Sequence, residues 1–188
     1  VEPIYARYGA TINVGTPTKP GYSFDGSWAP ALPDTMPVNG GTYTAKWTAG
    51  SADYLVQYWL ENANDANYSY DTSVSRSARV GSVINGSEDN SYTGFHFDHA
   101  DQNVTVNGDG TSVVNVYYKR NTYTLTFQVY ERSGLFGGDW VTKAEFPNVK
   151  YGEDTTKYWN QAPSGYLWYT AKNGDTFYTA APDMPNSN

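Results

Sequence analysis

Tyr8-Gly9, Val80-Gly81 and Tyr151-Gly152 decide how this chain is organised, because each pair opens the same short pattern. Twelve or thirteen residues after each glycine comes a second glycine followed by an aromatic residue, in Gly21-Tyr22, Gly94-Phe95 and Gly165-Tyr166. Two of the segments then carry a Met-Pro, at Met36-Pro37 and Met184-Pro185. Self-similarity at a period of about 70 residues is typical of arrays of small modules, which extend, present or bind more often than they catalyse.

The composition favours folded, acidic modules. The 188 residues include 18 Tyr, 6 Trp and 7 Phe but no Cys, so disulfides and thiolate metal sites are excluded. Aromatic rings bury a large apolar area at low conformational cost, which suits the core of a small module. The net charge of −7, with 12 scattered Lys and Arg, argues against nucleic acid as a partner. No apolar run is long enough for direct membrane insertion, and we expect a monomer.

Two stretches have the alternation and aromatic content of half-buried strands, and each opens a module: residues 54–60 and 123–130. A polar turn follows each of them, and then a second extended stretch, at residues 70–78 and 140–149. A hairpin is therefore predicted at the start of each of these modules.

The segment after Gly9, Gly81 or Gly152 is led by Thr, Ser or Asp, which predicts an N-cap and a short helix. The aromatic residue after the second glycine would start a third strand. Asn107-Gly108-Asp109-Gly110 predicts a tight hairpin between residues 104–106 and 112–114. This order implies a mainly β (α+β) fold, in which each module is a β-grasp-like mixed sheet with one short helix.

Three modules are therefore expected, at residues 1–50, 51–120 and 121–188. Linkers at residues 48–53 and 119–122 separate them and are short enough to restrict bending. We expect an elongated rod. The chain starts within a strand-like stretch and stops just after Met184-Pro185, so we also expect a fragment of a longer protein.

The modules resemble two related families of bacterial surface repeat. The first resembles the Listeria/Bacteroides (internalin B-type) repeat in Tyr8-Gly9-Ala10-Thr11-Ile12, Lys19-Pro20-Gly21-Tyr22-Ser23-Phe24-Asp25-Gly26 and Thr42-Tyr43-Thr44-Ala45-Lys46-Trp47. The second resembles the mucin-binding-protein (MucBP) repeat in Tyr54-Leu55-Val56-Gln57-Tyr58, Tyr92-Thr93-Gly94-Phe95 and Val114-Asn115-Val116-Tyr117-Tyr118. The third, from Tyr123 onward, is more divergent and is similar in Lys150-Tyr151-Gly152, Ser164-Gly165-Tyr166 and Asp183-Met184-Pro185.

This resemblance implies tandem β-grasp-like modules of large exported proteins, often anchored in the cell wall of Gram-positive bacteria. It brings no catalytic residue and no cofactor. The first module departs from its family in Ser27-Trp28, where a Trp commonly follows the Gly directly. We expect the first module to lack its first strand and the third its last, so that one or both end modules are incomplete or paired differently.

Two groups of residues could suggest a metal site, but neither has a complete set of ligands. His96, Asp98, His99 and Asp101 lie close together, but two His without a third firm ligand make a weak site. Some aspartates lie in polar turn sequences that resemble calcium-binding loops: Asp71, Asp89, Asp109 and Asp175. The spacing of an EF-hand loop is missing, and their role in turns explains these aspartates better. We predict no metal.

Catalysis is disfavoured too. A distant carboxylate pair stays open as a glycosidase hypothesis, but modules this small have little volume for a cleft that shifts a pKa. No Gly-x-Ser-x-Gly elbow is present. A Lys-to-Asn isopeptide bond, in place of disulfides, is a further hypothesis that intact mass would decide. We predict that the chain is not an enzyme.

The aromatic residues of the third module are the best candidates for a binding site. Trp140, Trp159, Trp168 and Tyr169 exceed what its short strands need and could stack on sugar rings, although core packing is the preferred explanation. Two functions are therefore carried forward. The first is a non-catalytic stalk or host-contact region of an extracellular adhesin on the bacterial surface. The alternative is a carbohydrate- or mucin-binding module, whose partner is a host glycoprotein, mucin or other surface protein.

Overall fold

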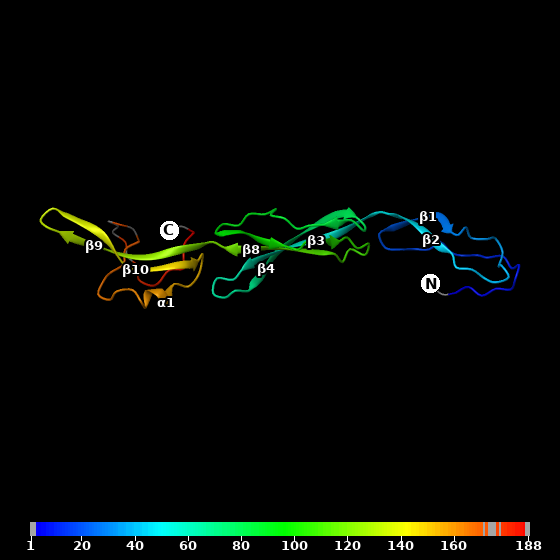
Figure 1. Cartoon of the computed structure of the whole chain (residues 1–188). Coiled ribbons are helices and arrows are strands. Elements are labelled where there is room, and N and C mark those ends of the chain that lie inside the picture. Colours follow the sequence, from blue (N-terminus) through cyan, green and yellow to red (C-terminus); the bar gives the residue numbers. More distant parts are fainter. Residues whose placement is uncertain (1–2, 171, 173–175, 177, 187–188) are drawn as a thin grey trace. The chain divides into compact units, whose positions relative to one another are not determined.

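The computed structural model describes residues 3–170, 172, 176 and 178–186 and is mainly β (Figure 1). Strands hold 49% of the described residues and helix 2%, so the predicted mainly β class is confirmed. The elements are β1 (Tyr22–Ala29), β2 (Thr44–Ala49), β3 (Ser51–Glu61), β4 (Tyr68–Arg79), β5 (Val83–Ile84), β6 (Phe95–Ala100), β7 (Val104–Thr105), β8 (Val113–Arg120), β9 (Thr122–Ser133), β10 (Gly137–Lys150) and α1 (Thr156–Trp159).

The chain forms two compact units. The first unit comprises Val1–Val56, Ser73–Gly86 and Asp101–Val114, and the second comprises Gln57–Thr72, Ser87–Ala100 and Asn115–Asn188. Residues 51–120, expected as one module, thus contribute to both units.

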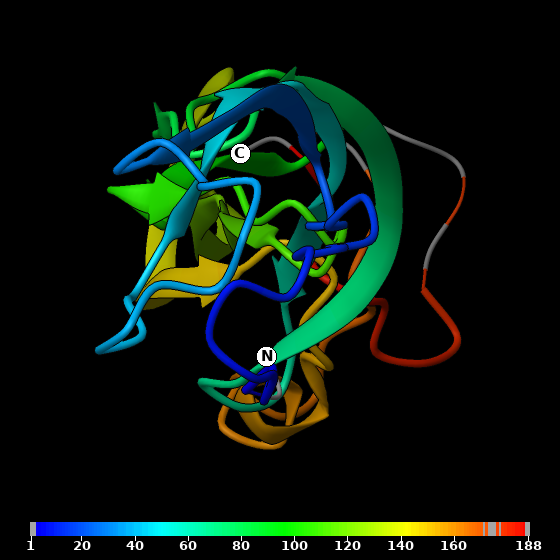
Figure 2. The same ribbon diagram turned by 90° about the vertical axis from the view of Figure 1, so that its right-hand side faces the viewer.

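The largest sheet has four strands in the order β4-β3-β8-β6. β6 and β8 are antiparallel. Near the start of β3, Leu55 donates its N–H to the carbonyl of Ser112, the residue before β8, and at the end of β3 the Glu61 side chain accepts from the N–H of Arg120, the last residue of β8. The residue numbers of the contacting positions thus rise together along the two strands. That rise is the mark of a parallel pair, and it makes the sheet mixed. β4 is long and curved (Figure 2), as strand twist favours.

Alternating side chains of this sheet form the best-buried core. Val56 and Tyr58 on β3 are 4% and 2% exposed, and Val116 and Tyr118 on β8 are 0% and 1% exposed. The Tyr118 hydroxyl donates to the Asn90 carbonyl, which satisfies its polar end inside the core.

Three two-stranded sheets complete the described β structure. β1 pairs with β2 and β9 with β10, both antiparallel and both interrupted by irregularities in register. β5 pairs with β7 over two residues. The hairpins predicted at residues 54–78 and 123–149 are confirmed as β3–β4 and β9–β10.

The glycine pattern corresponds to one repeated backbone turn. Gly9, Gly81 and Gly152 have φ of 75°, 82° and 70°, and the residue after each donates its N–H to the carbonyl three positions earlier. This is a type II turn, for which glycine is the preferred third residue. Each glycine N–H then bonds a carbonyl further along the chain, on Met36, Val106 and Met184 respectively, and the N–H of that residue bonds back beside the turn.

The linkers are shorter than predicted. β2 ends at Ala49 and β3 begins at Ser51, so Gly50 alone separates them, and Asn121 alone separates β8 from β9. Gly50 donates its N–H to the Gly21 carbonyl and accepts from the Val80 N–H. Asn121 makes the same two bonds with Gly94 and Tyr151. The flanking polar residues were expected to be linker, but they belong to strands because their backbones are paired.

Three further local predictions were wrong in whole or in part. A helix follows the first glycine only in the third segment, where the Asp154 side chain accepts from the Thr156 N–H as α1 begins. In the other two, Thr11 forms a bridge with Thr35 and β5 pairs with β7, because β-branched residues there find a backbone partner.

The Asn107–Gly110 turn does not close a hairpin, since β7 pairs with β5 and β8 with β3 and β6. The Ser112 hydroxyl bridges this loop instead, donating to the Thr105 carbonyl and accepting from the Asn107 N–H. A third strand follows Gly21 and Gly94 as predicted, but residues 166–170 after Gly165 form none.

Candidate functional site

An aromatic surface that sequence reasoning missed lies on the second unit. Its members all belong to the β4-β3-β8-β6 sheet, on the face opposite Tyr58 and Tyr118, and we call it the aromatic face. It consists of Trp59 on β3, Tyr68 and Tyr70 on β4, Asn115 and Tyr117 on β8, and Asp98 and His99 on β6. Aromatic residues at both even and odd positions of strand 54–60 were the signal that both faces of this sheet would be covered.

The rings of this face stand against one another across the strands. Tyr117 stacks on His99 with centroids 4.4 Å apart and planes 11° apart, and on Trp59 at 6.2 Å and 21°. Tyr70 meets Trp59 edge-on at 5.8 Å. Sugar binding needs an uncovered ring face, and both faces of Tyr117 are occupied by neighbouring rings. The arrangement therefore acts as a cross-strand staple on the outside of the sheet.

Hydrogen bonds hold the polar members in place. The Trp59 indole N–H donates to Asn115 Oδ1 at 2.8 Å, and the Tyr68 hydroxyl donates to Asp98 Oδ2 at 2.6 Å. His99 Nδ1 lies 2.8 Å from the same Asp98 oxygen. The hydrogen bond from Tyr68 lowers the pKa of Asp98, and burial followed by that bond raises the pKa of Tyr68. Asp98 is thus a structural acceptor that stays ionised.

The predicted third-module site separates into two places. Trp159 and Trp168 both pack edge-on against Phe127, with ring centroids 5.2 and 4.9 Å away, and Phe127 is only 3% exposed. The Trp159 indole nitrogen is buried and has no hydrogen-bond partner among the described residues. These two half-buried tryptophans thus pack on a buried ring.

Trp140 lies elsewhere. It pairs across the ribbon with Tyr130, at a centroid distance of 5.7 Å, and Tyr130 is three residues from Phe127 on β9. An odd separation on a strand places Tyr130 and Phe127 on opposite faces. Lys172 Nζ lies 5.6 Å from the Trp140 ring, and Tyr169 is 51% exposed. The four predicted residues therefore form no single platform.

A charged cluster surrounds the Asn121 linker. Glu61, 4% exposed, accepts from the Arg120 N–H at 2.9 Å and from Lys150 Nζ at 2.8 Å. The Arg120 guanidinium donates to the Glu61 and Tyr151 carbonyls, at 2.7 and 2.8 Å, and lies 4.7 Å from the centre of the Phe95 ring. Each buried charge thus has a charged or carbonyl partner, which is the condition for keeping it buried. We call Glu61, Phe95, Arg120, Lys150 and Tyr151 the Arg120 cluster.

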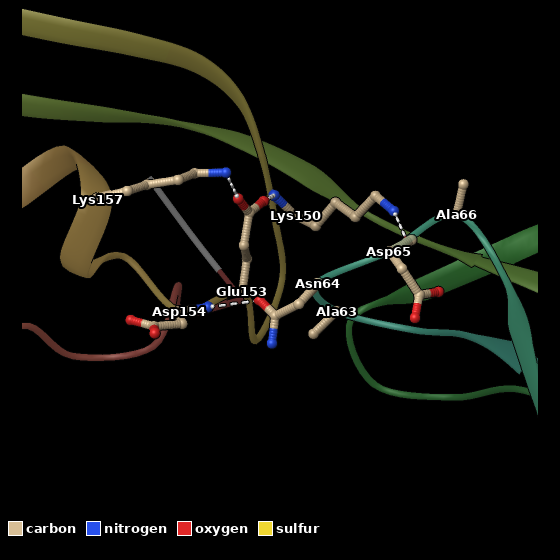
Figure 3. Close-up of a pocket in the computed structure, with 8 residues that line it drawn as sticks. All are labelled: Ala63, Asn64, Asp65, Ala66, Lys150, Glu153, Asp154 and Lys157. Atoms are coloured by element: carbon tan, nitrogen blue, oxygen red, sulfur yellow. Dashed lines mark hydrogen bonds and ion pairs between the residues drawn. The ribbon is translucent and has the colours of Figure 1, made fainter.

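An open polar notch lies beside the cluster (Figure 3). Lys157 Nζ contacts Glu153 Oε1 at 2.6 Å, and the Lys150 N–H donates to the other oxygen of Glu153. Burial of Glu153 works against its ionisation, but the bonds from Lys157, Lys150 and Tyr158 outweigh it and lower its pKa. The remaining lining residues are Ala63, Asn64, Asp65, Ala66 and Asp154. The Glu153 carboxylate is thus paired with Lys157, and its pKa is not raised as acid catalysis would need.

The suspected metal ligands have other partners. His96 Nδ1 lies 2.8 Å from Asn121 Oδ1, and His99 is engaged with Asp98. Asp109 accepts from the N–H and hydroxyl of Thr111, as turn chemistry predicts, and Asp71 accepts from the Tyr92 hydroxyl. Asp175 lies outside the described residues. Within the described part of the chain, no group of three or more His, Cys, Asp or Glu is placed to hold a metal.

Comparison with known proteins gave no match among family models, curated proteins or solved structures. No helix of the described residues has the length and apolar character needed to cross a membrane.

Proposed function

We propose that this chain is a non-catalytic stalk region of a bacterial surface adhesin, exported and held outside the cell, built from tandem β-grasp-like modules. One observation carries the proposal: Gly50 and Asn121 make the same pair of backbone hydrogen bonds between a preceding glycine and a following turn. A joint of one residue that is bonded on both sides leaves little freedom to bend. Repetition of such a joint produces a spacer.

The packing of the aromatic residues supports a mechanical role more than a binding role. The aromatic face stacks on itself, and Trp159 and Trp168 surround Phe127. The carboxylate of the notch is paired with lysine, which supports the non-catalytic assignment. Host glycoprotein or mucin contact would then be a property of the wider adhesin.

Small-angle scattering of the chain tests the stalk. A compact globule of this length has a radius of gyration of ~16 Å, whereas modules joined end to end give a clearly larger value and a rod-like distance distribution. A radius near the globular figure contradicts the proposal.

A glycan array tests the alternative of carbohydrate binding by the third segment. We expect no binding. Trp140→Ala is the informative variant because Trp140 lies off the Phe127 core, and Trp168→Ala serves as the core control. Glycan binding that a folded Trp140→Ala variant loses would favour the lectin.

A further inference from the structure

The segment between the two linkers begins and ends with neighbouring strands. β3 starts directly after Gly50, and β8 ends directly before Asn121. The two strands are adjacent in the four-stranded sheet and run in the same direction. Because they are parallel, the start of β3 and the end of β8 lie at opposite ends of the strand pair.

This connection decides how a lengthwise pull on the chain reaches the sheet. A force that enters at Gly50 draws β3 along its own axis, and a force that leaves at Asn121 draws β8 the opposite way. Such a pull shears the strands past each other, so the hydrogen bonds between them are loaded together. A pull applied to both strands at the same end would open those bonds one after another. The linkers are therefore attached in the orientation in which a strand pair resists force best.

At the end of β8, side chains strengthen the attachment to β3. The Glu61 carboxylate, on the last residue of β3, accepts from the Arg120 N–H at 2.9 Å and from Lys150 Nζ at 2.8 Å. The Arg120 guanidinium donates to the Glu61 carbonyl at 2.7 Å. Glu61 is 4% exposed, so water has little access to replace these bonds. The position that receives a force from Asn121 is thus held to β3 by charged groups.

Side chains on both faces of the sheet also oppose sliding of the two strands. On one face the Trp59 indole donates to Asn115 Oδ1 at 2.8 Å and stacks on Tyr117. On the other face the rings of Tyr58 and Tyr118 have centroids 6.5 Å apart. A shift of β8 along β3 separates these cross-strand pairs at the same time as it breaks the backbone bonds.

We infer that the parallel β3–β8 pair is a mechanical clamp, which keeps the segment between Gly50 and Asn121 folded when the chain is pulled lengthwise. The clamp deepens the proposed stalk function and rests on it for its use, since a stalk transmits tension between a cell and whatever the adhesin holds. The resistance itself is a property of the two strands and can be measured separately from the stalk.

Single-molecule pulling on the full chain tests the clamp, because a protein without Cys can be held at two introduced thiols. Ser51→Cys with Thr122→Cys gives the lengthwise pull. Ser51→Cys with Thr111→Cys gives the crosswise pull, since Thr111 precedes Ser112, whose carbonyl accepts from Leu55 near the start of β3. All three substituted residues are exposed.

The unfolding force should be at least about twofold higher in the lengthwise pull, because the bonds between parallel strands then break together. Equal forces in the two directions, or a higher force in the crosswise pull, overturn the inference.

Glu61→Gln, made in both cysteine pairs, separates the direction of the pull from a difference in stability. It removes a charge at the end of β8, which the lengthwise pull loads from the start and the crosswise pull reaches last. The unfolding force should fall in the lengthwise pull and stay unchanged in the crosswise pull. Equal effects of Glu61→Gln in the two directions, including no effect in either, overturn the clamp.

Small-angle scattering of the same chain keeps the two proposals apart. A rod-like distance distribution together with equal forces in the two directions would contradict the clamp alone. A globular radius of gyration together with a higher lengthwise force would contradict the stalk and support the clamp.

Discussion

The Gly50 and Asn121 linkers have the same backbone bonds, but different side chains surround them. At Gly50 the backbones themselves touch: a methyl group at Gly108 would lie 2.0 Å from the Pro20 carbonyl oxygen, and one at Gly21 would lie 2.5 Å from Gly108 Cα. At Asn121 the Arg120 cluster fills the space, and a methyl group at Gly94 would lie 2.1 Å from the Tyr151 ring. Added side-chain volume should therefore destabilise the structure around Gly50, and loss of a charged group should destabilise the structure around Asn121.

Removing the buried carboxylate at the second linker has the largest expected effect. Glu61→Ala removes the acceptor of the Arg120 N–H and the anionic partner of Lys150, whose Nζ keeps only its bond to the Asp65 carbonyl, at a cost of about 3 kcal/mol in the free energy of unfolding. This is the low end for a broken buried pair, because the Lys150 side chain is 23% exposed. Urea unfolding followed by circular dichroism measures it. A loss below about 1 kcal/mol would show that the cluster is no more than a surface ion pair.

The next largest loss of unfolding free energy is expected from adding one methyl group beside Gly50. Gly108→Ala forces Pro20 and Gly21 apart and should cost about 2 kcal/mol, as overpacking does. Gly15 has open space around it and φ outside the positive range, so Gly15→Ala is the matched control and should be neutral or slightly stabilising. Hydrogen exchange of the Gly50 and Val80 amides should accelerate in the first variant only. Equal behaviour of the two variants would contradict close backbone packing at Gly108.

Acid should weaken the second linker through Glu153. Because the folded state lowers the pKa of Glu153 below its ordinary value of 4.5, its contribution is complete above that pH and is lost as the pH falls through the folded value. Unfolding free energy measured from pH 6 down to about pH 3 should therefore decrease less steeply in Glu153→Gln than in the wild type. Glu145→Gln, exposed on β10, is the control and should keep the wild-type slope. Identical slopes in all three proteins would rule out a role for Glu153.

The smallest effect is expected at the exposed pair of Lys143 and Glu131, on the β9–β10 hairpin. Their side chains are 29% and 51% exposed, so Lys143→Ala should lower the free energy of unfolding far less than Glu61→Ala does. Thermal unfolding of Lys143→Ala and Glu61→Ala at low and high salt compares the stability lost in each variant. A cost equal to that of Glu61→Ala would mean that burial does not distinguish the two pairs.

Much of the local structure could be predicted from residue order. Aromatic and β-branched residues predict a strand at residues 54–60, and this stretch lies within β3 (Ser51–Glu61). The glycines of the repeated pattern take positive φ, the conformation for which glycine is suited. These features depend on neighbours within a few residues.

The candidate sites were harder to predict. The aromatic face needs β4, β3, β8 and β6 side by side, and Trp59 and Tyr117 are 58 positions apart in the sequence. Trp168 could be recognised as a core residue only once Phe127 was placed beside it. The length of a linker also depends on pairing, since Ala49 and Ser51 read as loop residues and lie in strands.

By itself, the sequence determined the mainly β character, the two long hairpins and the turn glycines, because alternation and positive φ are local properties of a chain. Only the tertiary structure decided which strand lies beside which, that Glu61 is buried against Arg120 and Lys150, and that Trp59, Tyr117 and His99 stack on one another. Those outcomes depend on contacts between distant residues, whose free energy exceeds the weak local preference of either partner.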